Sequence, residues 1–178
     1  MEKSFDHYSK FAELFIYPGN GFPQTVKQVQ ALLDQQYPLA GTELKIFSEF
    51  VSNATQTELE ELFTRSFDVQ AVTTLDLGYV LFGDDYKRGA VLVNLNREHR
   101  EAGNECYSEL ADHLPNILRL LHKMQKPELR AELVQKIVAP ALRKIIGEFD
   151  SEKLEKKNKI YKKHHKTLID RSEQYGMI

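Results

Sequence analysis

The chain has 178 residues, of which 42% are apolar and 28% charged, and its formal net charge is −2. This length and composition are typical of one soluble globular domain with a sizeable core. The near-neutral balance argues against a chain that binds nucleic acid through its overall charge. The single cysteine, Cys106, excludes an internal disulfide and favours a reducing compartment.

Helical spacing dominates the first 70 residues. Apolar side chains repeat every three or four positions, and this repeat predicts helices over residues 8–15, 23–35, 44–51 and from residue 57 onward. Gly41 is expected to close the connection between the second and third of these helices. Thr57 and Glu60 have the spacing of a capping box and are predicted to begin the fourth.

The second half of the chain continues the helical pattern. Residues 72–82 are apolar almost all round, which predicts a buried central helix that ends at Gly83. Asp84 or Asp85 is expected to cap the next helix, which runs to about Ala102 and is followed by Gly103. Asp112 is predicted to cap another helix with Pro115 in its first turn, and Pro127 to begin one that Pro140 kinks.

No segment shows convincing strand alternation, so the sequence predicts an all-α, single-domain bundle of about eight or nine helices with short loops. The charge is uneven along it. Residues 151–178 carry eight Lys/Arg and four acids, which leaves 16 basic and 22 acidic residues in 1–150. We expect a helical domain over 1–150 and a basic helix or partly disordered tail over 151–178.

Motifs for catalysis or cofactor binding are not evident. The sequence has no phosphate-binding glycine loop and no cysteine–histidine spacing suited to zinc. An enzyme built on Cys106 with His113, or on the pair Asp84-Asp85, is the weaker interpretation, because an incidental thiol and helix capping explain these residues more simply. We therefore expect no catalytic residue, no metal and no cofactor.

Four short segments occur in a characteristic order. They are Tyr17-Pro18, residues 62–68 (LFTRSFD), residues 77–89 (LGYVLFGDDYKRG) and residues 109–115 (ELADHLP). The third is similar to a Y-x-x-x-G-D-x-x-x-R-G core, and the fourth to an E-L-P-D-[HY]-L-P loop in which Ala111 replaces the usual proline. Together they resemble the NarJ/TorD family, the nitrate reductase delta chains that assist assembly of molybdenum enzymes. The resemblance covers about residues 8–150.

The resemblance implies a cytoplasmic chaperone that is not an enzyme and does not insert into a membrane. Such a protein binds the N-terminal peptide of a molybdoenzyme catalytic subunit, either a twin-arginine leader or its remnant. It delays export or membrane docking while the molybdenum cofactor is inserted. Nitrate reductase is one such client, and the sequence does not identify which client this chain serves.

The peptide is expected to lie as a helix in an apolar groove with acidic rims. By motif position, Tyr79, Asp84, Asp85 and Arg88 would form one edge and Glu109, Asp112 and His113 the other, and Phe82 and Leu114 complete the predicted peptide-binding set. His113 is a candidate pH switch for release of a basic peptide, because histidine changes its charge between pH 5 and 8.

Two questions stay open at this stage. The same features would suit a helical adaptor or scaffold that binds some other partner peptide. The oligomeric state, monomer or dimer, is also not fixed by the sequence.

Overall fold

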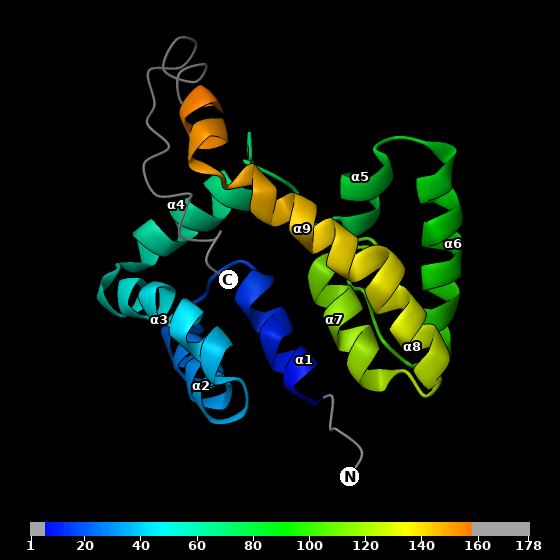
Figure 1. The fold of residues 1–178 in the computed structure, drawn as a ribbon, viewed down its shortest axis with the longest axis horizontal. Coiled ribbons are helices and arrows are strands. Elements are labelled where there is room, and N and C mark those ends of the chain that lie inside the picture. The colour runs from blue at the N-terminus through cyan, green and yellow to red at the C-terminus, as the bar shows by residue number, and fades with distance from the viewer. Residues whose placement is uncertain (1–5, 158–178) are drawn as a thin grey trace. The chain divides into compact units, whose positions relative to one another are not determined.

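A computed structural model describes residues 6–157 of the chain, and this part is all-α, which confirms the predicted fold class. Its labelled helices run from α1 to α9 (Figure 1), and a further helical stretch covers residues 151–157. Pairing of the β type is confined, within these residues, to an isolated antiparallel bridge between Asp76 and His113. None of the helices described combines the length and apolar character needed to cross a membrane.

The described chain divides into two compact units, residues 6–16 with 75–144 and residues 17–74 with 145–157. The part of the predicted lysine-rich tail beyond residue 157 lies outside the described residues. The motif residues of segments 77–89 and 109–115 all belong to the first unit.

The first unit is built around α7 (Leu114–Lys123), whose side chains are mostly buried. α1 (Asp6–Ala12) and the following 3-10 turn (Glu13–Phe15) pack along α7. Arg119 and His122 of α7 pair with Glu13 and Asp6 at 3.2 Å each. The other elements of this unit are α5 (Leu77–Phe82), α6 (Tyr86–Glu101), α8 (Pro127–Leu133), a π-turn at Val134–Val138 and the first part of α9 (Ala139–Glu148).

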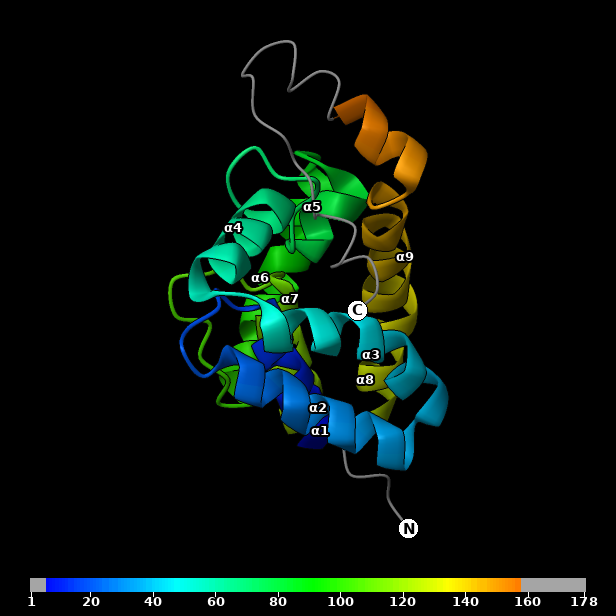
Figure 2. The same cartoon turned by 90° about the vertical axis from the view of Figure 1, so that its left-hand side faces the viewer.

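The second unit contains an antiparallel pair, α2 (Phe22–Gln36) and α3 (Pro38–Asn53), which lie side by side in both ribbon views (Figures 1 and 2). Gly41 belongs to the first turns of α3 rather than to the connection, so that prediction was wrong. A Cβ atom there would stand 3.0 Å from the backbone nitrogen of Asp34 in α2. The glycine is needed because the two helices approach each other closely at this point.

The predicted helix over residues 72–82 is also wrong in its first half. Only α5, Leu77–Phe82, is helical. The carbonyl of Leu75 accepts from the N–H of Leu114, and the N–H of Leu77 donates to the carbonyl of Asp112, both at 2.9 Å. These backbone groups are paired with a distant segment, so they cannot also form helical hydrogen bonds.

The helix around Pro140, where a kink was predicted, changes its hydrogen-bond pattern. The π-turn Val134–Val138 directly precedes α9, and the N–H of Ala139 donates to the carbonyl of Val134, five residues earlier. Proline has no N–H to donate, and a π-turn is one of the known ways in which a helix accommodates such an interruption.

The cap of α4 (Gln56–Phe67) is not the predicted one. Thr55, not Thr57, is the N-cap residue, and Glu58, not Glu60, completes the capping box. The Thr55 side chain accepts from the N–H of Glu58 at 3.3 Å, and the Glu58 carboxylate accepts from the N–H of Thr55 at 2.9 Å. The N-cap lies two residues earlier than the sequence pattern indicated.

We expect Thr55→Ala to lower the free energy of unfolding by about 1 kcal/mol, because the first turn of α4 loses its side-chain acceptor. The matched control is Thr57→Ala, which should change stability by less than about 0.5 kcal/mol at an exposed helical position. Urea denaturation of both variants measures the difference. A larger loss for Thr57→Ala would contradict the observed cap.

Candidate functional site

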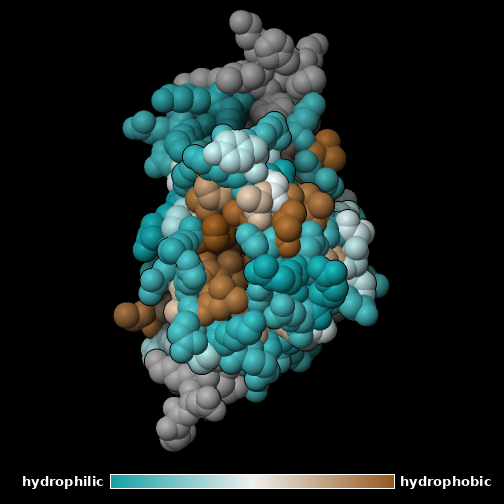
Figure 3. Space-filling view, turned by 90° about the vertical axis from the view of Figure 1, so that its right-hand side faces the viewer, coloured by the Kyte–Doolittle hydropathy of each residue, from teal (hydrophilic) through white to brown (hydrophobic). Residues whose placement is uncertain are grey.

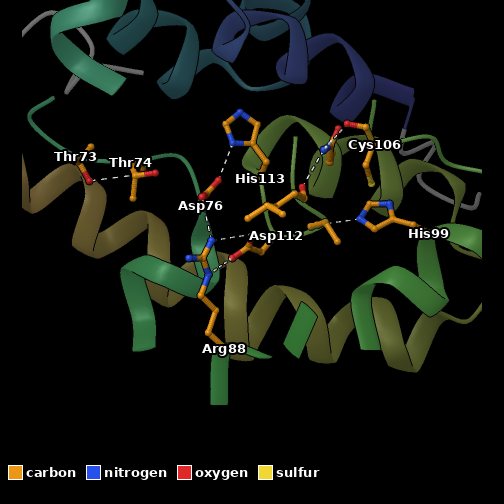
Figure 4. Close-up of polar contacts among 11 residues, drawn as sticks. Thr73, Thr74, Asp76, Arg88, His99, Cys106, Asp112 and His113 are labelled. Atoms are coloured by element: carbon orange, nitrogen blue, oxygen red, sulfur yellow. Dashed lines mark hydrogen bonds and ion pairs between the residues drawn. The ribbon is translucent and has the colours of Figure 1, made fainter. Parts of the chain in front are cut away.

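Arg88 stands at the centre of an ion-pair network in the first unit (Figure 4). It lies in the first turn of α6, and its side chain is 16% exposed. Its Nε atom donates to Oδ2 of Asp112 at 3.0 Å, and one terminal nitrogen donates to Oδ2 of Asp76, also at 3.0 Å. The guanidinium therefore links α6 to the segments that precede α5 and α7.

Asp112 is completely buried. A buried carboxylate is costly unless it is paired and hydrogen-bonded, and Arg88 supplies both the charge and the donors. The backbone of Asp112 is fixed as well, because its carbonyl accepts from Leu77. The predicted role of Asp112 as the cap of α7 is wrong: His113 occupies the N-cap position, and the Asp112 side chain turns to Arg88 instead.

Asp76 joins His113 to the same network. Its Oδ1 atom lies 2.9 Å from Nδ1 of His113. The pKa of Asp76 lies below its ordinary value of 3.8, first because of the hydrogen bond from His113 and also because of the positive charges of His113 and Arg88. Burial acts in the opposite direction but is outweighed. Asp76 is therefore held as a carboxylate between two donors.

Gly78 makes room for the network. A Cβ atom at this position would lie 2.6 Å from Oδ2 of Asp112 and 3.3 Å from Cγ of Arg88. The first distance is shorter than real Cβ contacts, and the carboxylate it would displace is buried. Gly78 is thus required by the close approach of α5 to the ion pair.

A second buried cluster holds the segment between α6 and α7, residues 104–111, which we call the 104–111 loop. Nε2 of His99 lies 2.9 Å from the carbonyl oxygen of Ala111, and Nδ1 of His99 lies 2.9 Å from the side-chain nitrogen of Asn104. The Asn116 amide donates to the carbonyls of Cys106 and Leu110 at 3.2 and 3.0 Å. Both ends of the loop and its middle are therefore fixed by buried side chains.

The predicted peptide-binding residues fall into two groups. Tyr79 (42% exposed), Asp84, Asp85 and Glu109 reach the surface, and Phe82 is half-buried. By contrast, Arg88, Asp112, His113 and Leu114 face the interior of the unit and have partners there. The two predicted edges are not separate, because Arg88 of one is paired with Asp112 of the other.

The exposed members also have local structural roles. Asp85 caps α6, where its carboxylate accepts from the N–H of Lys87 at 2.8 Å. The Tyr79 ring lies 5.2 Å from the guanidinium carbon of Arg88, a cation–π distance. Tyr79 is therefore an exposed aromatic side chain held in a fixed orientation by the buried network.

The residues considered for an enzyme have structural partners, and Asp85 caps α6. His113 is bonded to Asp76, and burial raises the pKa of the Cys106 thiol, which disfavours the reactive thiolate. In residues 6–157 no three acidic, histidine or cysteine side chains are grouped as a metal site would require.

Sequence reasoning missed several residues of this region: Asp76, Gly78, His99, Asn104 and Asn116. One signal was available, because Asp76 is the single charged residue in the apolar run 72–82, and a lone charge in such a run needs a partner. The two asparagines and His99 gave no such signal, since their roles depend on contacts across the 104–111 loop.

An apolar strip lies on the face of the first unit formed by α5, α6 and α8, where Figure 3 shows apolar side chains between hydrophilic margins. α6 buries only Leu95 and His99 among its 16 residues, and Val93 is 70% exposed. We define the apolar strip as the following apolar residues of α5, α6, α8 and the π-turn that are not fully buried: Val80, Leu81, Phe82, Val91, Leu92, Val93, Leu129, Val134 and Ile137. Of these nine, Val93 is the one that is largely exposed.

No protein-family model matches this sequence, and no curated protein matches it. The motif residues and their geometry therefore carry the functional proposal.

We expect Gly78→Ala to lower the free energy of unfolding by roughly 1–3 kcal/mol, because the added methyl displaces the buried Asp112 carboxylate from Arg88. Gly89→Ala is the matched control: apart from its chain neighbours and the backbone of its own helix, no atom lies within 4 Å of the position its Cβ would take. It should stabilise α6 by up to about 1 kcal/mol. Chemical denaturation of the two variants should thus give shifts of opposite sign, and shifts of equal sign would contradict the close approach at Gly78.

Proposed function

We propose that this protein is an assembly chaperone of the NarJ/TorD type, which binds the N-terminal peptide of a molybdoenzyme catalytic subunit during cofactor insertion. The observation that carries the proposal is the pairing of Arg88 with Asp112. It joins the two motif segments that the family resemblance rests on, although they are 24 residues apart in the chain. This one buried contact fixes the positions of the two segments relative to each other.

The apolar strip supports the same proposal. Exposed apolar surface that is contiguous and bordered by polar residues is typical of a surface that another molecule covers. An amphipathic peptide helix would place its apolar side chains against α5 and α6. The strip begins at α5, directly before the turn that carries Asp84 and Asp85.

Exposed carboxylates give the proposed surface its preference for a basic peptide. Asp84 and Asp85 lie at the α5–α6 turn, and Glu109 lies in the 104–111 loop. Charges at the rim of such a surface mainly raise the association rate and fix the register of the ligand. Tyr79 adds an exposed aromatic side chain, whose ring lies against Arg88.

The buried members of the predicted set take a different role in this proposal. Asp112 and Leu114 support the surface from within, and Arg88 orients Tyr79 while it neutralises Asp112. Replacing these residues would change affinity through the fold, so the exposed residues are the ones that test peptide contact.

The test is calorimetric titration with synthetic N-terminal peptides of molybdoenzyme catalytic subunits. We expect saturable binding of one peptide, and several-fold weaker binding by Asp84→Asn/Asp85→Asn, at about 0.2–1 kcal/mol per exposed charge. Asparagine caps a helix as well as aspartate does, so α6 is preserved. The double change Glu43→Gln/Glu49→Gln, at exposed positions of α3, is the matched control and should leave affinity unchanged.

Val93→Lys tests the apolar strip in the same titration. The substitution is at an exposed position, so the fold should tolerate it, and it should weaken binding of a basic peptide by more than the control does. Absence of binding to every such peptide by the folded protein would contradict the proposed function.

A further inference from the structure

The hydrogen bonds of His99 define which of its nitrogens carries a proton. The side-chain nitrogen of Asn104 donates to Nδ1 of His99 at 2.9 Å and to the carbonyl of Asn116 at 3.1 Å. Nδ1 must therefore accept, and Nε2 carries the hydrogen that it donates to the carbonyl of Ala111. The ring, 3% exposed, is held as the neutral Nε2–H tautomer.

A protonated His99 cannot be accommodated by a simple rearrangement. A hydrogen on Nδ1 would face the amino group of Asn104, so two donors would oppose each other. Turning the Asn104 amide would present its oxygen to His99, but that oxygen would then face the carbonyl of Asn116, 3.1 Å from the same position. One of the two contacts is lost in either arrangement.

The 104–111 loop depends on these contacts and is under backbone strain. Tyr107 has a φ of 52°, a conformation that bulky L-residues rarely adopt. Asn104 holds the start of the loop to α7, and His99 holds its end at Ala111, next to Asp112. Protonation of Nδ1 opposes the contact with Asn104 but keeps the Nε2–H bond to Ala111, so the strained segment is released at its start.

We infer that His99 is an acid-sensitive latch: protonation of its ring opens the 104–111 loop, which carries Glu109, and a neutral ring keeps the loop closed. The opening itself is a property of the fold. Its consequence, weaker binding of a basic peptide at acidic pH, rests on the proposed function.

The charges around the ring agree with this direction. Burial lowers the pKa of His99 below its ordinary value of 6.5, and the hydrogen bond to Ala111 only partly opposes that effect. Lys123 of α7, which donates to the carbonyl of Gly103 at 3.0 Å, lowers the pKa further. Near the ring, α6 also carries Arg97, Glu98, Arg100 and Glu101, and its first turn carries Tyr86, Lys87 and Arg88. The loop carries Glu105, Cys106, Tyr107 and Glu109, and α7 also carries Arg119 and His122.

The sign of the pH dependence follows from the lowered pKa. The open loop takes up a proton near pH 6.5, whereas the closed loop does so only at lower pH. The closed form is therefore fully favoured above about pH 6.5 and loses stability as the pH falls toward the closed-state pKa. If the His99 pKa in the closed loop is lowered far enough, the population of the open loop rises up to about tenfold at one pH unit below the ordinary histidine pKa.

Cys106 offers a direct measurement, because it is the only cysteine of the chain and lies within the loop. The rate of its reaction with dithiodipyridine is measured for the wild type and His99→Gln from about pH 7.5 to 5.5. Glutamine keeps a donor and an acceptor but does not titrate. The intrinsic pH dependence of the thiol cancels in the ratio of the two rates.

We expect this ratio, wild type over His99→Gln, to rise several-fold as the pH falls. The control His122→Gln, at an α7 histidine that pairs with Asp6 outside the loop, should behave as the wild type. A constant ratio would overturn the latch. If His99→Gln does not fold, the Cys106 reaction rate of the folded wild type is instead divided by the rate of the wild type unfolded in denaturant. This second ratio must also rise as the pH falls. The measurement uses no peptide, so the latch and the proposed function can fail separately.

Discussion

The guanidinium of Arg88 must neutralise a carboxylate that has no access to water, and much of the first unit is arranged to meet this constraint. Asp112 is completely buried, and Arg88 contacts it at 3.0 Å while holding Asp76 on the other side. A buried pair of this kind is weak evidence for stability in itself, because desolvation offsets much of the attraction. Removal of Arg88 or Asp112 alone is costly, however, because it leaves a buried charge unpaired. The surrounding residues must therefore hold the two side chains in contact.

The consequence is a division of roles within the motif segments. Arg88, Asp112 and His113 act inside the unit, whereas Tyr79, Asp84 and Glu109 reach the surface. The interior set fixes where the surface set lies, and within the described residues the apolar strip stays partly exposed. His99 adds a second buried site of control, because the 104–111 loop that presents Glu109 is closed only around a neutral ring.

Helices with regular apolar spacing could be predicted from the sequence, as α2, α3 and α7 illustrate, since their stripes face a core in the structure. The irregular start of segment 72–82 could not, because the N–H groups of Val72 and Thr73 donate to residues 65 and 66, and the carbonyl of Leu75 accepts from Leu114. These bonds between segments override local preference. The same holds for the site. Arg88 and Asp112 were both in the predicted set, but their pairing and the need for Gly78 depend on contacts between distant segments.

The most direct test is a double-mutant cycle between Arg88 and Asp112, with Arg88→Met, Asp112→Asn and the double variant compared by chemical denaturation. We expect strong coupling, because each single change leaves a buried polar group without its partner. The double change should cost at least about 1.5 kcal/mol less than the sum of the two single changes. Additive losses, with coupling below about 0.5 kcal/mol, would contradict the claim that this pair holds the two motif segments together.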